Sequence, residues 1–520
     1  MKKAATPSFI LALSLKVQPY QRDILNMRLE LARNIYNACI TELERRYALV
    51  QQSKAYQKTM KQIRASYRQE QKQNHLNKIH GTKKTVSLEK LRKPLYKALS
   101  QHYRTYGLSE FDLHSFVAPM VQHVSCHIDS FTGQKIASHA WNAMASVLFG
   151  KGQRLHYKKY GQMNSLEGKS NRSGIRYRDG ILHWLGLSIP VIVSRHDAYV
   201  QEALLTHRVK YCRIVRKVIR GDYRFFVQLV MEGYPPQKRE KDSGMFKRQT
   251  QNAPVGLDIG TQTLAVSAQE SVRLLELAPS VQQHEKELRR IGRKLDRQRR
   301  ANNPHKYNPD GTIKKGHREP WIQSKNYLKT LFQLKELKRK QAALRKQDHE
   351  ILANAIIKLG NEIKVETMRY DALAKRTKDT KVSEKTGRFH SKKRFGKSIA
   401  NKAPALFLSI LTRKLGYFGK PLFKIVTQKV KASQYNHIDK TYTPKTLDER
   451  WTLLPYQGQS LPIQRDLYSA FLIQHVTPAT LDTIEVSQCE KHFDRFVALH
   501  QVEIERLRLD SRKKLASMGM

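Results

Sequence analysis

Cysteine is scarce in this sequence. Its 520 residues include only four cysteines, and none of them forms a C-x-x-C pair: Cys39, Cys126, Cys212 and Cys489. The sequence therefore contains no readable zinc ribbon or redox motif, and it fits a reducing, cytoplasmic compartment. Long apolar runs are missing as well, because no stretch reaches the roughly 18 residues that a membrane-spanning helix needs.

Acidic residues are few compared with basic ones. The chain has 44 Asp and Glu against 96 Lys and Arg, which gives a formal net charge of +52. Such an excess repels itself unless a polyanion neutralises it, so an ordinary metabolic enzyme is not the first expectation. Aromatic residues make up 8% of the chain, which is too many for a disordered basic tail. We therefore expect nucleic acid as the partner.

The start of the chain has the outline of a signal peptide. Lys2 and Lys3 precede a short apolar run from Phe9 to Leu15. The run is at the lower length limit and no A-x-A site follows it, so we expect a buried β-strand over residues 8–18 instead.

Because single cores stop growing near about 250–300 residues, the whole chain should form two or more domains.

The first half of the chain combines helical and strand patterns. Apolar spacing predicts a helix over residues 23–47, and the Lys/Gln/Arg-rich stretch at 50–90 predicts a solvated helix or a mobile segment. Residues 175–233 alternate apolar and polar positions between Arg-Asp-Gly and Arg-Gly-Asp turn signals, which predicts strands. We expect these strands to pair with the strand at 8–18, so that the helices between them form an insertion.

Three basic zones are candidates for nucleic-acid contact: the stretch at 50–90, the stretch at 151–161 and the pair of long helices expected at 281–301 and 321–359. The second zone interleaves aromatic and basic side chains, which suits base stacking together with phosphate contact; its candidates are Arg154, Tyr157, Lys158 and Lys159. An exposed basic turn is the alternative for any one of them. The long helices predict an antiparallel hairpin, with a solvated coiled coil as the alternative.

One aspartate stands in a strand that otherwise reads as buried. Asp258 lies in Val-Gly-Leu-Asp-Ile-Gly at 255–260, before a turn and a second strand. Two further acids have comparable settings, since Glu366 ends the strand-like 363–365 and Asp466 opens an apolar helix. An unpaired buried carboxylate is unfavourable unless a cation such as Mg²⁺ binds it. Three converging carboxylates suit two Mg²⁺ ions on a phosphodiester, where one activates water and the other stabilises the leaving oxygen.

Two alternatives remain open at this point. Glu362 stands four residues before Glu366 and could serve in its place. The segment Leu-Asp-Ile-Gly-Thr-Gln-Thr at 257–263 also resembles the phosphate loop of sugar kinases and actin-like ATPases. Those proteins carry the loop near the N-terminus, and no second glycine-rich adenosine motif follows here, so we favour the metal-binding interpretation.

The C-terminal half resembles the TnpB family of transposon-encoded RNA-guided nucleases and the related miniature type V CRISPR effectors. V-G-L-D-I-G-T-Q-T-L-A at 255–265, I-K-V-E-T-M at 363–368 and Q-R-D-L-Y-S-A-F at 464–471 are similar to their three RuvC motifs. The segments at 394–407 and 431–434 are similar to other family segments. In the N-terminal half the match is limited to the layout and to R-x-x-Y-N at 33–37.

This resemblance implies a fold of mixed α/β and helical type. An RNase H-like (RuvC) nuclease domain with a helical insertion would follow a β-barrel (wedge) domain that carries a helical recognition insertion. The implied boundaries are a first wedge segment at 1–20, recognition helices at 21–174, a second wedge segment at 175–240, a linker at 241–253, the nuclease at 254–424 with its hairpin at 281–359, a target nucleic-acid-binding insert at 425–462, and the nuclease end at 463–520.

The implied function is RNA-guided, Mg²⁺- or Mn²⁺-dependent hydrolysis of DNA in a prokaryotic cytoplasm. The protein, as monomer or dimer on one RNA, would bind a structured guide RNA and read a short motif beside the target in double-stranded DNA. Asp258, Glu366 and Asp466 would form the catalytic and metal-binding triad. The further nucleic-acid contacts implied are Arg394, Lys397, Ser433 and Gln434.

The sequence departs from the family at the zinc ribbon. Many members carry four cysteines between the second and third motifs, whereas residues 433–451 contain no cysteine and only His437. One histidine cannot build a zinc site, so we expect no zinc and interpret His437 as a surface or packing residue. Without a metal, the insert should pack against the nuclease body, and the candidate contacts are Tyr435, Tyr442, Trp451, Leu453 and Leu454. Those aromatic side chains could instead contact DNA.

Two other functions compete with cleavage. One is an RNA-guided DNA-binding repressor, which would be expected to lose the acids first, although all three are present. The other is a DNA-joining transposase with an RNase H-like core, which would more often carry a helix-turn-helix that this sequence does not show.

Overall fold

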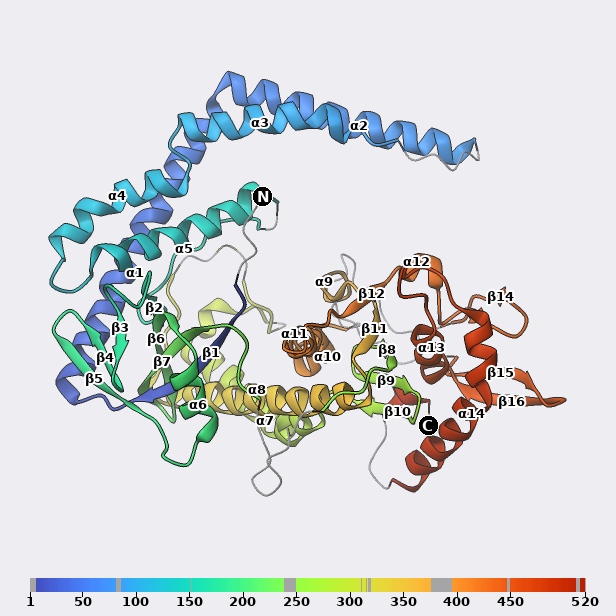
Figure 1. Cartoon of the computed structure of the whole chain (residues 1–520). Helices are drawn as coiled ribbons and strands as arrows, with labels where there is room; N and C mark the ends of the chain where they lie inside the picture. Colours follow the sequence, from blue (N-terminus) through green and yellow to red (C-terminus); the bar gives the residue numbers. More distant parts are fainter. Residues whose placement is uncertain are drawn as a thin grey trace. The chain divides into compact units, whose positions relative to one another are not determined.

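The computed structural model describes residues 6–80, 86–150, 152–237, 249–309, 311–314, 316, 319–375, 395–446, 449–510 and 515–519. The chain divides into two compact units, Met1–Pro236 and Gln237–Met520, and each is described by itself (Figure 1). Among the residues that the structure describes, no helix combines the length and the apolar character that a bilayer crossing requires.

A seven-stranded antiparallel sheet organises the first unit. Its order is β2-β6-β7-β1-β5-β4-β3. The bounds are β1 Ser8–Leu15, β2 Ser165–Glu167, β3 Arg176–Arg178, β4 Ile181–Trp184, β5 Leu187–Ile192, β6 Val209–Ile219 and β7 Asp222–Glu232. The strand expected at 8–18 is confirmed as β1, and it pairs with β7 along its length and with β5 at its end. β2 and β3 stand at the two ends of this order, so the pairings of the described strands give a curled sheet without closing a barrel.

Helices fill the interval between β1 and β2. They are α1 Pro19–Gln52, α2 Lys54–Ile79, α3 Glu89–Thr105, α4 Glu110–His123 and α5 Ser130–Leu148, and a short α6, Ala198–Thr206, follows β5. The periodic apolar residues of α1, including Leu29, Cys39 and Leu43, are buried in one core with α4, α5 and the sheet. The basic stretch at 50–90 is a solvated helix, α2, as far as Ile79, and residues 81–85 lie outside the described ranges.

The second unit is built on a five-stranded mixed sheet of order β10-β9-β8-β11-β12. The strands are β8 Pro254–Ile259, β9 Thr263–Ala268, β10 Ser271–Glu276, β11 Glu362–Glu366 and β12 Phe423–Ile425. β8, β9 and β10 form an antiparallel meander, whereas β11 runs parallel to both β8 and β12. Two apolar cores include residues of this sheet, one shared with α8 and α11 and the other with α13 and α14.

The helices and short turns of the second unit cover this sheet or extend from it. They are η1 Pro279–His284, α7 Glu285–Asn302, η2 Pro304–Lys306, α8 Lys325–Leu359, α9 Tyr370–Leu373, α10 Gly396–Lys402, α11 Pro404–Gly416, α12 Thr427–Val430, α13 Arg465–Gln474, α14 Val486–Leu509 and η3 Ala516–Met518. The predicted hairpin is confirmed: α7 and α8 pack together through Ile291, Leu295 and Leu337. Basic residues predominate over the rest of α7 and over α8 as far as Lys346, whereas the C-terminal end of α8 is apolar and is buried through Ala353, Ile356 and Ile357.

The insert between β12 and α13 consists of two small hairpins. They are β13 Tyr435–Asn436 with β14 Thr441–Tyr442, and β15 Trp451–Tyr456 with β16 Gln459–Gln464. Tyr435 and Leu454 are buried in the core shared with α13 and α14, and Trp451 packs against that core. Leu453 and Tyr442 are 67% and 50% exposed, so the expected contact through these two is wrong. Successive side chains of a strand point to opposite faces, which turns Leu453 outward where Leu454 turns inward.

His437 has the packing role that the sequence left as one of two choices. It is 1% exposed, and its backbone N–H donates to the Tyr468 hydroxyl at 3.1 Å, while its ring Nδ1 lies 2.6 Å from the same oxygen. Phe471 and Phe493 pack around its ring, and burial lowers the pKa of His437 to about 4. The first hairpin of the insert is thereby joined to α13 and α14 by a neutral imidazole.

Candidate active site

Asp258 and Glu366 lie side by side at the carboxyl ends of two neighbouring parallel strands. The register of β8 and β11 pairs Pro254 with Glu362 and runs on to Leu257 with Val365. One further step along the same register brings Asp258 next to Glu366. The edge where parallel strands end is the usual place for functional side chains in open α/β sheets.

Glu362, the open alternative to Glu366, lies at the opposite end of β11. At about 3.3 Å per residue, four residues separate the two carboxylates by roughly 13 Å along the strand. Glu362 instead forms an ion pair with Lys364 at 3.0 Å. The geometry therefore favours Glu366 as the partner of Asp258.

Asp466 approaches this edge from α13, which packs across β8 and β9. The helix comes so close that a Cβ atom placed on Gly256 would lie 2.0 Å from the carbonyl oxygen of Ala470. Two buried contacts hold the end of α13: Lys364 Nζ donates to the Gln474 carbonyl at 3.0 Å, and Ser267 Oγ donates to Gln474 Oε1 at 2.7 Å. Asp466 stands in the first turn of this anchored helix.

The three carboxyl groups influence one another electrostatically. Burial raises the pKa of Asp258 well above its usual value, and the nearby charges of Glu366 and Asp466 raise it further. Burial also raises the pKa of Glu366, to about 7. Asp466 differs, because Arg465 donates to its carboxylate at 3.1 Å and Arg450 lies 3.7 Å from it. The site therefore disfavours ionisation of Asp258 and Glu366 together, beside a third carboxylate that arginines hold.

The donor set suits a divalent cation of the Mg²⁺ type. Within the described ranges, no three Asp, Glu, His or Cys side chains form a group that could hold one metal ion. Asp258 and Glu366 nevertheless supply two hard oxygen ligands, and the crowding that raises the pKa of Asp258 would be relieved by a bound cation.

Tyr370 is a site residue that the sequence alone did not reveal. It lies in α9, is 9% exposed, and its hydroxyl has no hydrogen-bond partner among the described residues. Burial raises the pKa of Tyr370, and the charges of Asp258 and Glu366 raise it further, so the phenol lies near both carboxylates. The available signal was the position of a tyrosine four residues after Glu366, which sequence patterns could not distinguish from packing.

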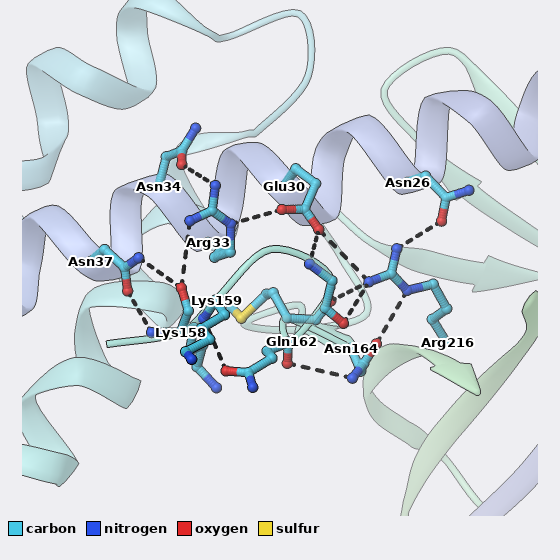
Figure 2. A network of polar contacts seen from close by, with 12 residues as sticks. Asn26, Glu30, Arg33, Asn34, Asn37, Lys158, Lys159, Gln162, Asn164 and Arg216 are labelled. Carbon is cyan, nitrogen blue, oxygen red and sulfur yellow. Dashed lines mark hydrogen bonds and ion pairs between the residues drawn. The ribbon is translucent and has the colours of Figure 1, made fainter. Parts of the chain in front are cut away.

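The expected nucleic-acid contacts fall into separate places. In the loop at 152–164 of the first unit, Arg154 and Lys159 are exposed, the Tyr157 hydroxyl donates to Glu44 at 2.7 Å, and the backbone of Lys158 is held by Asn37 (Figure 2).

In the second unit the contacts lie on two elements. Lys397 is an exposed side chain on α10, 3.9 Å from Glu285, and Ser433 and Gln434 form the turn before β13. Gln434 is partly buried, and its N–H donates to the Lys431 carbonyl at 2.8 Å. Arg394 lies outside the described residues. These contacts stay predictions.

Replacing Asp258 by asparagine should stabilise the protein in metal-free buffer. A carboxyl group whose folded-state pKa is raised weakens folding as the pH rises above its unfolded pKa, which is about 4. The gain should therefore be near zero at pH 4 and largest at pH 8, where about 1 kcal/mol would raise the melting temperature by about 2–4 °C. Thermal melts in EDTA measure this.

Asp466→Asn is the matched control for that experiment. It removes a carboxylate that Arg450 and Arg465 hold, so it should not raise the melting temperature. A fall in the melting temperature of Asp258→Asn at pH 8 would show that the charge of Asp258 is well accommodated, against this account of the site.

Comparisons with known proteins give a distant structural likeness. No family model matches the chain, and no curated protein matches it. The cryo-EM structure of a Cas12f1–sgRNA–target DNA complex is similar at 12% identity and a TM-score of 0.41, over 90% of this chain and 99% of that chain. A CRISPR–Cas12f ternary complex is similar at 12% identity and a TM-score of 0.23, over 89% and 83%. Identities and scores this low assign no residue role and no activity to this chain.

Proposed function

We propose that this protein is an RNA-guided DNA endonuclease that hydrolyses phosphodiester bonds with divalent metal ions at Asp258, Glu366 and Asp466. The observation that carries the proposal is the strand register that brings Asp258 next to Glu366 at the ends of β8 and β11, where burial raises the pKa of Asp258 and the charge of Glu366 raises it further. The resemblance of all three acidic segments to RuvC motifs supports the same reaction class.

Each residue of the site has a distinct role in this proposal. A bound Mg²⁺ or Mn²⁺ supplies Lewis acidity, which activates water and stabilises the leaving oxygen. Asp258 and Glu366 hold the cations on the rigid sheet edge, and Asp466 contributes the third carboxylate from α13. Before a cation binds, Arg450 and Arg465 hold the carboxylate of Asp466 in place. The hydroxyl of Tyr370, which has no hydrogen-bond partner among the residues that the structure describes, is a donor within this region for a phosphate oxygen or an ordered water.

The charge distribution supports nucleic acid as both guide and target. Much of the net charge of +52 is carried by α2, by the loop at 152–164 and by the basic faces of α7 and α8. Neutralising phosphates with so many cations releases counterions, so affinity should fall steeply as salt rises. The resemblance to RNA-guided nucleases adds the division of labour in which base pairing reads the sequence.

The experiment that tests this function uses the RNA that copurifies with the protein. The complex is purified at low salt from cells that carry the native locus, and its RNA is sequenced. Duplexes that match the variable end of that RNA, with randomised flanks, are then incubated with the complex and Mg²⁺. Cutting that follows the RNA sequence supports the proposal. Protein free of nucleic acid at low salt, or cutting that ignores the RNA, contradicts it.

The insert should fold without zinc. Its aromatic and aliphatic side chains share a core with α13 and α14, and His437 is bonded to Tyr468 rather than available as a ligand. Elemental analysis of the purified protein should therefore find well under one zinc per chain, and activity should return after chelation once Mg²⁺ is restored. Stoichiometric zinc, or loss of activity that only zinc restores, would contradict this.

A further inference from the structure

The loop at 152–164 contains no strand or helix, yet it is fixed in shape by side chains of α1. Asn37 forms two hydrogen bonds with Lys158, donating from Nδ2 to its carbonyl at 2.9 Å and accepting at Oδ1 from its N–H at 2.9 Å (Figure 2). Further along the loop, the Gly161 N–H donates to Glu30 Oε1 at 2.9 Å. Lys158 and Gly161 are thus anchored to α1, and they flank Lys159 and Tyr160 on both sides.

Arg216, from β6, contacts the loop beside Asn164 (Figure 2). Its side chain is 2% exposed, and it donates to the Gly161 carbonyl at 3.3 Å, the Met163 carbonyl at 3.2 Å and Asn26 Oδ1 at 2.8 Å. Burying a guanidinium is unfavourable unless its donors are satisfied. Here two of the hydrogen bonds go to the loop backbone and a third, from Nε, goes to Asn164 Oδ1 of the same loop, so the shape of the loop is strongly specified.

The rigid tip presents an aromatic side chain to solvent. Tyr160 stands between the two anchors and is 82% exposed, and Lys159 beside it is exposed as well. Gly161 follows with a φ of +72°, a left-handed conformation that turns the chain back after Tyr160. The neighbouring Tyr223 covers the Arg216 guanidinium at 4.4 Å and is itself 37% exposed.

We propose that this tip is a stacking platform for an unpaired nucleobase, with Tyr160 as the stacking surface and Lys159 and Arg154 as contacts to the adjoining phosphates. A phenol ring offers a face to any base, and stacking on an aromatic side chain contributes about 1–3 kcal/mol per base. Because the tip is ordered before binding, little conformational entropy is lost on association. The inference rests on the proposed function in taking nucleic acid as the partner, but it is independent of cleavage.

Binding of short single strands tests the platform directly. The probes are fluorescein-labelled RNA and DNA oligonucleotides of the same unstructured sequence, with a duplex of that sequence as a third probe, titrated against full-length protein freed of RNA at high salt. Tyr160→Ala should weaken single-strand binding by about 5- to 150-fold, which is the range that corresponds to the stacking energy. Tyr160→Trp should restore it, and the duplex should be affected much less.

Phe111→Ala is the matched control, because Phe111 is equally exposed at 80% but lies on α4 without such anchoring. It should bind like wild type, and both variants should melt like wild type. The RNA and DNA arms show which strand the tip holds. Single-strand affinity of Tyr160→Ala within twofold of wild type, or equal losses for duplex and single strands, would overturn the platform. Wild-type protein that binds no probe would overturn the nucleic-acid partner itself.

Discussion

Loss of guide-dependent cleavage, by about a thousandfold or more, is the expected result of Asp258→Asn, Glu366→Gln or Asp466→Asn. Metal ions at such sites contribute several kcal/mol of transition-state stabilisation, and about 4 kcal/mol corresponds to a thousandfold in rate. Each substitution removes one carboxylate from the edge where β8, β11 and α13 meet, with almost no change in side-chain volume. Single-turnover cleavage of a matched duplex at saturating Mg²⁺ measures the effect.

Glu362→Gln is the control for this series. It makes the same Glu-to-Gln change on the same strand, β11, but about 13 Å from Glu366. The interaction that it removes is the ion pair of Glu362 with Lys364. Its cleavage rate should stay within a few-fold of wild type, and binding of guide RNA should be unchanged in all four variants. A triad variant that cuts at the wild-type rate would remove that residue from the site.

Gly256→Val should be the most damaging substitution in the second unit outside the carboxylates. A Cβ atom there would meet the Ala470 carbonyl oxygen at 2.0 Å and the Gln474 nitrogen at 2.4 Å, and both belong to helix backbone that cannot rotate away. The helix α13 must then shift from β8 and carry Asp466 with it. Overpacking of this kind typically costs about 1–3 kcal/mol and sometimes more, and cleavage should be lost as well.

Gly292→Ala provides the opposite expectation. Gly292 lies inside α7 with nothing within 4 Å of an added Cβ, so the substitution should stabilise the helix by roughly 0.5–1 kcal/mol. Thermal melts and cleavage rates of the two variants measure the contrast. Wild-type stability of Gly256→Val would show that α13 does not pack against β8 as closely as the structure has it.

The positions of the acidic residues could be predicted from the sequence because each stands out locally. Asp258 is the one charged residue in an apolar strand, and Glu366 and Asp466 lie at the ends of regular elements, where functional side chains concentrate. Strand spacing alone does not separate Glu362 from Glu366, since both lie on one strand with an even spacing; the resemblance of residues 363–368 to the second RuvC motif favoured Glu366 and left Glu362 as the alternative. The register with β8 then brings Glu366, and not Glu362, next to Asp258.

Other features depend on contacts between residues far apart in the chain. Two examples are the close approach of α13 to Gly256 and the hydrogen bonds from Arg216 to the loop at 152–164. Neither leaves a recognisable pattern in the nearby sequence. The same holds for the partly wrong contact set of the insert. Its aromatic and aliphatic residues were identified as a group, but that Leu454 turns inward and Leu453 outward follows from the pleat of β15. Tyr370 was missed because its significance comes from its position in the fold: its phenol is buried near Asp258 and Glu366, and its hydroxyl has no hydrogen-bond partner among the described residues.

The central claim, that Asp258, Glu366 and Asp466 form one divalent-cation site, is tested most directly by locating bound Mn²⁺. Anomalous scattering from crystals of the protein soaked in Mn²⁺ should give a peak between the carboxylates of Asp258 and Glu366, with the Asp466 side chain turned from Arg465 toward it. The peak should be absent from Asp258→Asn crystals treated in the same way. Saturating Mn²⁺ that gives no peak at these residues, or a peak that survives in Asp258→Asn, would contradict the account.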